Sequence, residues 1–177
     1  ILADTIKKQI SINNKCSIGY YPSLYGVDLT ISGKNLKEIQ NLKKKIQSLI
    51  DKNIYSDGDG NMEKTIVENA INKNKTIAIA ESCTGGLVGA RITEIAGSSK
   101  IFKGGVVSYS DSSKINILGV KKSTIQSFGA VSKQVAKEMA DKTRKIFSVD
   151  YALSITGIAG PGGGTESKPV GLVYIGL

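Results

Sequence analysis

The stretch Glu81-Ser-Cys-Thr-Gly-Gly86 holds the residues of this sequence that are best suited to chemistry. It lies between a predicted strand and a predicted helix, and loops at the carboxyl ends of strands in α/β sheets commonly bind ligands. A helix start near Thr84 would offer free N–H groups to a phosphate or an oxyanion. Gly85 and Gly86 would let a ligand approach the backbone closely. The same spacing also fits an ordinary turn in which Ser82 caps the helix.

Two neighbouring side chains compete for the role of nucleophile. The chain contains no His, which excludes Ser-His-Asp and Cys-His catalysis and imidazole metal sites. Ser82 would therefore need Lys or Tyr as its activator. Cys83 could have a lowered pKa at a helix N-terminus, although buried Cys is more often a core filler. The residues alone leave both open.

A second stretch, Tyr109-Ser-Asp-Ser-Ser-Lys114, could supply the activator. No Lys of the chain has a Ser three residues before it, so any Ser–Lys pair must join separate elements. Tyr109 is expected to close a strand at 106–109 and so to lie at the same sheet edge as Ser82. We expect Asp111 to cap a helix with Lys114 in its first turn, where the helix dipole and burial favour a neutral amine. The alternative is a surface lysine and a core tyrosine.

The third stretch begins at Thr156 and has five Gly residues within 157–164. Such a segment cannot pack a core, and it suits a loop that closes over a substrate. It is not a dinucleotide fingerprint, because no helix follows it. The alternative is a disordered connector.

Together these stretches resemble the CinA family of competence/damage-inducible proteins, and in particular its C-terminal amidase domain. The segments that carry the resemblance run in family order through about residues 75–177, and they are Glu81–Gly86, Phe102-Lys-Gly-Gly105 with Tyr109 and Lys114, Gly129-Ala-Val-Ser132, Thr156–Thr165 and Lys168-Pro-Val-Gly171. The N-terminal region is similar to the KH-type connecting domain of longer family members. It has no Gly-x-x-Gly clamp, so this similarity does not imply RNA binding.

The resemblance implies hydrolysis of the carboxamide of nicotinamide mononucleotide to nicotinate mononucleotide and ammonia, with no metal or cofactor. It implies Ser82 as nucleophile, Lys114 as its base, and Tyr109 as a proton relay or positioning partner. It also implies substrate and oxyanion contacts from a set of loop residues, namely Glu81, Thr84, Gly85, Gly86, Thr156 and Gly157. The alternative is a non-catalytic binding module associated with competence or DNA damage. The family's last strand and helix, beyond Leu177, are absent from this sequence, so the resemblance implies an incomplete amidase domain.

The elements that must position these residues alternate between strands and helices from residue 62 onward. This alternation predicts a layered α/β/α domain at 62–177. Residues 1–56 predict a small α+β, KH-like domain that ends in a short strand at 53–55, and the polar, Gly-rich residues 57–61 read as a linker. Residues 57–68 resemble a calcium loop, but Met62 stands where that loop needs Gly. Asn61 reads better as the cap of a helix at 62–72.

The amino-acid composition limits the classes of partner that the chain is expected to bind. The net charge of +9 arises from 24 basic and 15 acidic residues, and only two of the basic residues are Arg. The charge is spread evenly, so it does not support nucleic-acid binding, which leans on Arg for base readout, and it suits a small anionic substrate as well. Two Cys do not make a metal or disulfide pattern. No apolar run is long enough for a membrane helix. We expect a cytoplasmic homo-oligomer that acts on a small nucleotide.

Overall fold

The computed structural model describes residues 2–11, 15–24, 26–58 and 61–177. The chain divides into two compact units, with the boundary between residues 59 and 60. No helix in the described ranges is both long and apolar enough to cross a bilayer.

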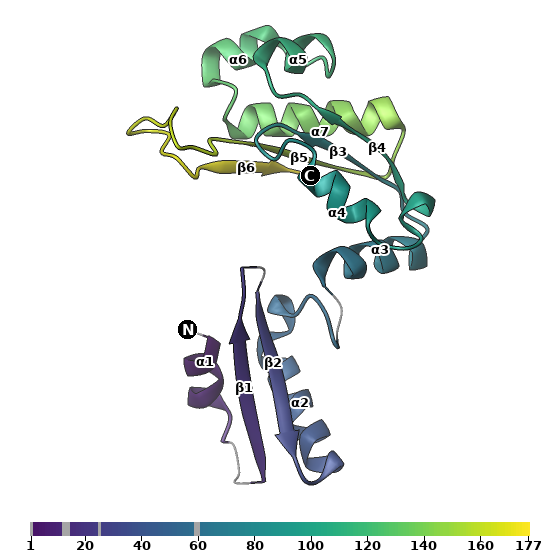
Figure 1. The fold of residues 1–177 in the computed structure, drawn as a ribbon, viewed down its shortest axis with the longest axis vertical. Helices are drawn as coiled ribbons and strands as arrows, with labels where there is room; N and C mark the ends of the chain where they lie inside the picture. The colour runs from purple at the N-terminus through teal and green to yellow at the C-terminus, as the bar shows by residue number, and fades with distance from the viewer. Residues whose placement is uncertain (1, 12–14, 25, 59–60) are drawn as a thin grey trace. The chain divides into compact units, whose positions relative to one another are not determined.

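The N-terminal unit is a two-stranded antiparallel sheet packed against two helices (Figure 1). Its elements are α1 (Leu2–Gln9), β1 (Cys16–Pro22), β2 (Val27–Gly33) and α2 (Leu36–Ile50). Ile6, Ile10, Leu42 and Ile46 form its buried core. The prediction of a short strand at 53–55 is wrong. The chain instead forms a 3-10 turn, η1 (Asp51–Asn53), directly after α2. Likeness of this unit to a KH domain stays a prediction.

The C-terminal unit is built on a four-stranded sheet in the order β4-β3-β5-β6. Its elements are α3 (Met62–Asn72), β3 (Ile77–Glu81), α4 (Leu87–Thr93), η2 (Ser98–Lys100), β4 (Phe102–Val107), α5 (Asp111–Asn116), α6 (Lys122–Phe128), α7 (Lys133–Phe147), β5 (Tyr151–Gly157) and β6 (Val173–Gly176). β3 runs parallel to β4 and β5, and β6 is antiparallel to β5. Asn61 caps α3, as the sequence predicts, and Ser132 caps α7.

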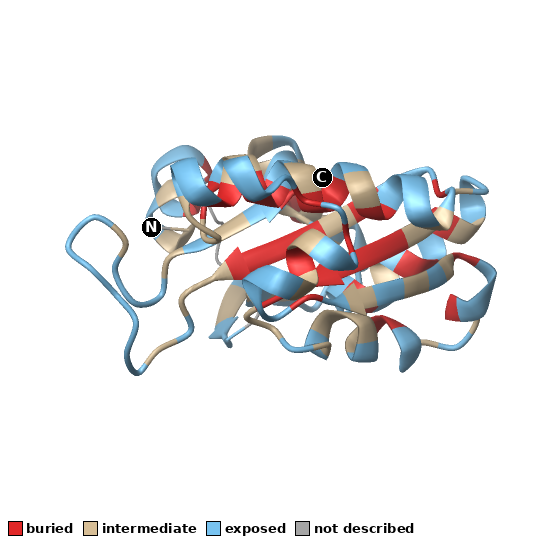
Figure 2. Cartoon of the chain, turned by 90° about the horizontal axis from the view of Figure 1, so that it is seen from above, coloured by how far each residue is buried: buried red, intermediate tan, exposed pale blue. Residues whose placement is uncertain are grey.

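Helices cover both faces of this sheet, which confirms the layered α/β prediction (Figure 1). Alternate residues of β3 point to opposite layers: Ile79 packs with residues of α3 and α4, and Ala80 packs with residues of α6 and α7. The central strands are therefore buried, whereas the segment between β5 and β6 is largely exposed (Figure 2).

Asp150, immediately before β5, links β5 to Lys75 and Thr76, which immediately precede β3. The Asp150 carboxylate accepts hydrogen bonds from the backbone N–H of Thr76 at 2.8 Å, the Thr76 hydroxyl at 2.9 Å and the Lys75 ammonium at 2.9 Å. These donors, with the Lys75 hydrogen bond first, lower the pKa of Asp150 to about 2. A lowered carboxyl pKa stabilises the fold above the unfolded-state value and loses this effect as pH falls toward the folded-state value.

We therefore expect Asp150→Asn to lower Tm by a few degrees at pH 6, and the gap to wild type to narrow between about pH 4 and pH 2. Thermal unfolding of both proteins across this pH range measures the gap. A constant gap would show that the charge of Asp150 does not matter. Asp141→Asn is the matched control, because Asp141 is an exposed carboxylate on α7.

Candidate functional site

Ser82 stands at the carboxyl end of the central strand β3. Its backbone N–H donates to the Ile155 carbonyl at 3.0 Å, which continues the pairing of β3 with β5 by one residue. On the other side, the Ser108 N–H donates to the Glu81 carbonyl at 2.8 Å and continues the pairing with β4. Ser82 is only 7% exposed. Two flanking strands thus fix the hydroxyl in place.

The Lys114 side chain comes from α5 and is buried, with 1% exposure. Its Nζ lies 3.0 Å from Ser82 Oγ, 2.9 Å from the Ser108 carbonyl and 3.0 Å from the Tyr109 carbonyl. The fold therefore brings together the Ser and the Lys that the sequence proposed as a pair, across 32 residues of chain.

These three contacts decide where the amine can take a proton. As an ammonium, Lys114 donates one N–H to each of the three oxygens. A carbonyl can only accept, so a neutral amine keeps its two N–H groups on Ser108 and Tyr109. Its lone pair then faces the Ser82 hydroxyl, which becomes the donor. The two carbonyls thus orient the amine as a base for Ser82.

Burial is what makes a neutral amine accessible. Desolvation lowers the pKa of Lys114, and the negative charge of Asp111 opposes it more weakly. Across the described part of the chain, no carboxylate lies within ion-pair distance of Lys114. The expectation that Asp111 caps this helix is wrong: the Ser110 hydroxyl accepts from the Ser113 N–H, and Lys114 lies in the last turn of α5. The structure thus attributes the pKa shift to burial.

Tyr109 contacts the pair through its main chain. β4 ends at Val107, so Tyr109 follows the strand instead of closing it. Its carbonyl holds Lys114, while the residue is 73% exposed and its phenol bonds to no described residue. Tyr109 therefore positions the base through a backbone atom, and a relay role for its phenol stays a prediction.

Glu81 occupies the helix end that the sequence left open for a ligand. α4 begins at Leu87, not near Thr84. The buried Glu81 carboxylate accepts the N–H groups of Gly86 at 3.0 Å, Val88 at 3.1 Å and Gly89 at 2.8 Å. The expectation of free N–H groups here is therefore wrong. Glu81 thus holds the 82–86 turn against the start of α4, and a substrate contact by Glu81 stays a prediction.

We expect Glu81→Gln to lower the free energy of unfolding by about 2–3 kcal/mol, because an amide has one acceptor oxygen where the carboxylate has two and leaves buried N–H groups unsatisfied. Chemical denaturation measures this effect. Glu94→Gln, at the exposed C-terminal end of α4, should change stability by less than about 0.5 kcal/mol. Equal stability of the two variants would contradict the role given to Glu81.

Cys83 packs into the apolar layer beside Ile79 and Ile155. Burial raises the pKa of its thiol. The backbone N–H of Cys83, the charge of Lys114 and the backbone N–H of Thr84 oppose this rise, and the charge of Glu81 adds to it. A side chain at Gly157 would meet Cys83 Sγ at 3.1 Å and the Leu172 carbonyl at 2.8 Å. The absence of a side chain at Gly157 therefore leaves the space that the Cys83 thiol needs. The thiol is therefore a weaker nucleophile than the sequence allowed for.

The backbone N–H groups of the turn after Ser82 have different acceptors. Those of Cys83 and Thr84 interact with the Cys83 thiol, and neither donates to a backbone oxygen among the described residues. The buried Thr84 Oγ1 has no partner there. The Gly85 N–H donates to the Ser82 carbonyl at 3.1 Å, so it is not free for a ligand. Gly85 and Gly86 adopt positive φ angles of 62° and 105°, which favour glycine.

Thr156 ties the turn before α7 to the same sheet edge. Its buried hydroxyl donates to the Ala130 carbonyl at 3.0 Å. Sequence reasoning missed this contact and the two carbonyls on Lys114, since backbone acceptors carry no residue-type signal. It also missed Lys168, whose Nζ donates to the Phe128 carbonyl at 2.6 Å. Within the residues that can be described, no three Cys, Asp or Glu side chains gather as metal ligands.

Comparison with known proteins identifies the family of the chain. The sequence profile described as the CinA C-terminal domain matches residues 59–177. A competence-damage inducible protein of Thermoanaerobacter sp. (strain X514) is 50% identical over 154 residues, which cover 84% of this chain and 37% of that protein. One from Alkaliphilus metalliredigens is 42% identical over 182 residues, which cover 99% of this chain and 44% of the relative. The chain spans less than half the length of these curated relatives.

Solved structures show the same likeness. The competence/damage inducible protein CihA from Agrobacterium tumefaciens has 43% sequence identity and a TM-score of 0.63, with coverage of 64% of this chain and 68% of that chain. A CinA superfamily protein from Escherichia coli has 30% identity and a TM-score of 0.64, with coverage of 71% and 76%. Profile, relatives and fold agree, and the chain belongs to the CinA family, with the family's C-terminal domain at residues 59–177.

Proposed function

We propose that this domain is an amidohydrolase that removes ammonia from the carboxamide of nicotinamide mononucleotide. The observation that carries the proposal is the buried Lys114 amine, held by two carbonyls at hydrogen-bond distance from the Ser82 hydroxyl. A hydroxyl with a neutral amine as its base is a nucleophile suited to acyl transfer. The resemblance described above supplies the substrate.

The reaction proceeds in two halves. The Ser82 hydroxyl gives its proton to Lys114 as Oγ attacks the carboxamide carbon. The Lys114 ammonium then protonates the leaving nitrogen, the C–N bond breaks and ammonia departs, which leaves an ester on Ser82. In the second half, water gives a proton to the neutral amine and attacks this ester. The ester C–O bond breaks, the proton returns from Lys114 to Ser82 Oγ, and the carboxylic acid is released and loses its remaining proton to water or to the departed ammonia.

The oxyanion of each tetrahedral intermediate needs hydrogen-bond donors close to Ser82. The N–H groups of Cys83 and Thr84 donate to no oxygen of the described residues and interact only with the Cys83 thiol, a weak acceptor that an oxyanion can replace. They follow the nucleophile directly in the chain, which suits an oxyanion formed at Ser82. We assign the oxyanion contact to them in place of Gly85 and Gly86, whose N–H groups are already bonded within the turn.

The test is release of ammonia and nicotinate mononucleotide from nicotinamide mononucleotide by the 177-residue chain, with Ser82→Ala as the control. Product identity by chromatography separates amide hydrolysis from loss of the base. If both proteins release ammonia equally, the role of Ser82 is wrong. If neither does and nucleic acid or a protein partner binds to both, the chain is a binding module.

A further inference from the structure

We propose that Lys168 binds the phosphate of the mononucleotide substrate and so selects phosphorylated amides. This inference rests on the proposed function, because it concerns the same site. An anionic substrate needs a cationic or N–H-rich contact. The N–H groups at the start of α4, which the sequence suggested for this contact, already donate to the Glu81 carboxylate.

Lys168 is held in a fixed place. Within the segment between β5 and β6, the Lys168 N–H donates to Thr165 Oγ1 at 3.0 Å, and its carbonyl accepts the Thr165 N–H at 2.8 Å. The ammonium donates to the Phe128 carbonyl at 2.6 Å. A side chain at Gly129, where φ is 75°, would meet Lys168 Nζ at 2.8 Å, so the glycine leaves room for the ammonium. The cation is thus preorganised, which lowers the entropy cost of binding.

Lys168 is linked to the strand ends beside Ser82 by a series of hydrogen bonds. The Phe128 carbonyl that holds its ammonium is two residues from Ala130, whose carbonyl accepts the Thr156 hydroxyl. Thr156 follows Ile155, whose carbonyl accepts the Ser82 N–H. Three hydrogen bonds, joined by short backbone steps, thus relate Lys168 to the nucleophile. In the substrate, likewise, a ribose separates the phosphate from the amide.

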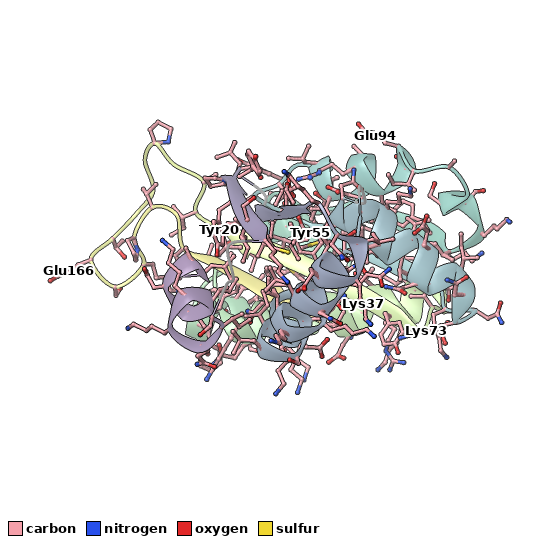
Figure 3. All side chains as sticks on the ribbon, turned by 90° about the horizontal axis from the view of Figure 1, so that it is seen from below. Tyr20, Lys37, Tyr55, Lys73, Glu94 and Glu166 are labelled. Carbon is pink, nitrogen blue, oxygen red and sulfur yellow. The ribbon has the colours of Figure 1, made fainter. Side chains whose placement is uncertain are left out.

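The positive charge of the Lys168 ammonium is not balanced by an ion pair, because in the described residues no carboxylate lies within ion-pair distance of it. The nearest acidic residue in sequence, Glu166, points outward at the far end of its loop (Figure 3). Lys168 is half-buried, with a single carbonyl for its three donors. A phosphate oxygen can accept the remaining N–H groups in charge-assisted hydrogen bonds.

The experiment compares nicotinamide mononucleotide with nicotinamide riboside, which has the same amide and no phosphate. We expect Lys168→Gln to raise KM for the mononucleotide by about 10- to 100-fold, the usual value of a hydrogen bond to a charged group. Its kcat and the kinetics with the riboside should stay near wild type. Lys168→Arg should recover most of the loss. Lys145→Gln is the matched control, because it removes an equal charge at the opposite end of α7 from Ser132.

A second arm does not depend on turnover. In the Ser82→Ala background, calorimetric titration with the mononucleotide should give a Kd that Lys168→Gln weakens by about tenfold or more and Lys145→Gln leaves unchanged. Equal effects of the two substitutions in both arms would overturn the assignment of Lys168 and leave the amidase proposal standing. No hydrolysis by wild type would overturn the amidase proposal, and the titration would still decide on Lys168.

Discussion

Ser82→Ala should reduce ammonia release from nicotinamide mononucleotide by about 10³-fold or more, because removal of an acyl-transfer nucleophile abolishes the covalent route. The fold should survive, since Lys114 keeps its two carbonyl partners and the Ser82 backbone keeps its bond to Ile155. Steady-state kinetics and thermal unfolding measure the two properties. Mass spectrometry of wild type during turnover should show the ester on the peptide that contains Ser82.

Two neighbours serve as controls for this result. Cys83→Ala should keep activity within about threefold, since the thiol is half-buried and its pKa is raised. Ser108→Ala should behave likewise, because Lys114 contacts the Ser108 carbonyl, while its buried hydroxyl has no partner among the described residues. Loss of activity in Cys83→Ala with retention in Ser82→Ala would transfer the nucleophile to the thiol.

Lys114→Met should lower kcat by about 10²- to 10⁴-fold, the range for loss of a general base. Lys114→Arg should be as inactive as Lys114→Met, because a guanidinium keeps its proton and cannot accept another. In wild type, kcat/KM should rise with pH as Lys114 loses its proton, below the ordinary lysine pKa of 10.5. The residual rate of Lys114→Met should lack this rise. An unchanged pH profile in the variant would assign the proton transfer to another group.

The same titration affects stability. The pKa of Lys114 is lowered in the folded protein, so between that value and 10.5 the unfolded state binds one proton more than the folded state. The free energy of unfolding of wild type should therefore gain up to about 1.4 kcal/mol per pH unit across this window, relative to Lys114→Met. Asp150 raises the pKa of Lys75, so the titration of Lys75 changes stability only above pH 10.5. This effect is the same in wild type and Lys114→Met, and it does not contribute to the difference between them. A flat difference would mean that Lys114 stays charged when buried.

Much of the C-terminal unit follows from local patterns in the sequence. The strand before Glu81 and the cap Asn61 stand where the sequence predicts them. The start of β4 does not, because the sequence predicts this strand only from residue 106 and β4 begins at Phe102. In the fold, a side chain at Gly105 would meet the Ile79 carbonyl at 3.0 Å, and one at Gly104 would meet the ring of Phe147 at 2.5 Å. The two glycines serve tertiary packing, which local propensity does not report.

In the candidate site, too, some features could be predicted from the sequence and others could not. The absence of His and the residue types at Ser82 and Lys114 were enough to propose the pair. The role of Glu81 could not be read from the sequence, because a carboxylate beside a turn suits a ligand contact and a helix cap equally. The carbonyls that orient Lys114 belong to the backbone and would be present with any residue type. The chemistry was thus visible in side chains, and its orientation only in the fold.

The arrangement of β3 between two parallel neighbours has a consequence for how this protein acquires activity. Ser82 is fixed only after β3 pairs with β4 and with β5, which begins more than 70 residues further along the chain. Such long-range pairings carry a high loop-closure entropy and form slowly. A state in which β3 lacks either pairing does not fix Ser82 against Lys114, so turnover reports that both pairings have formed.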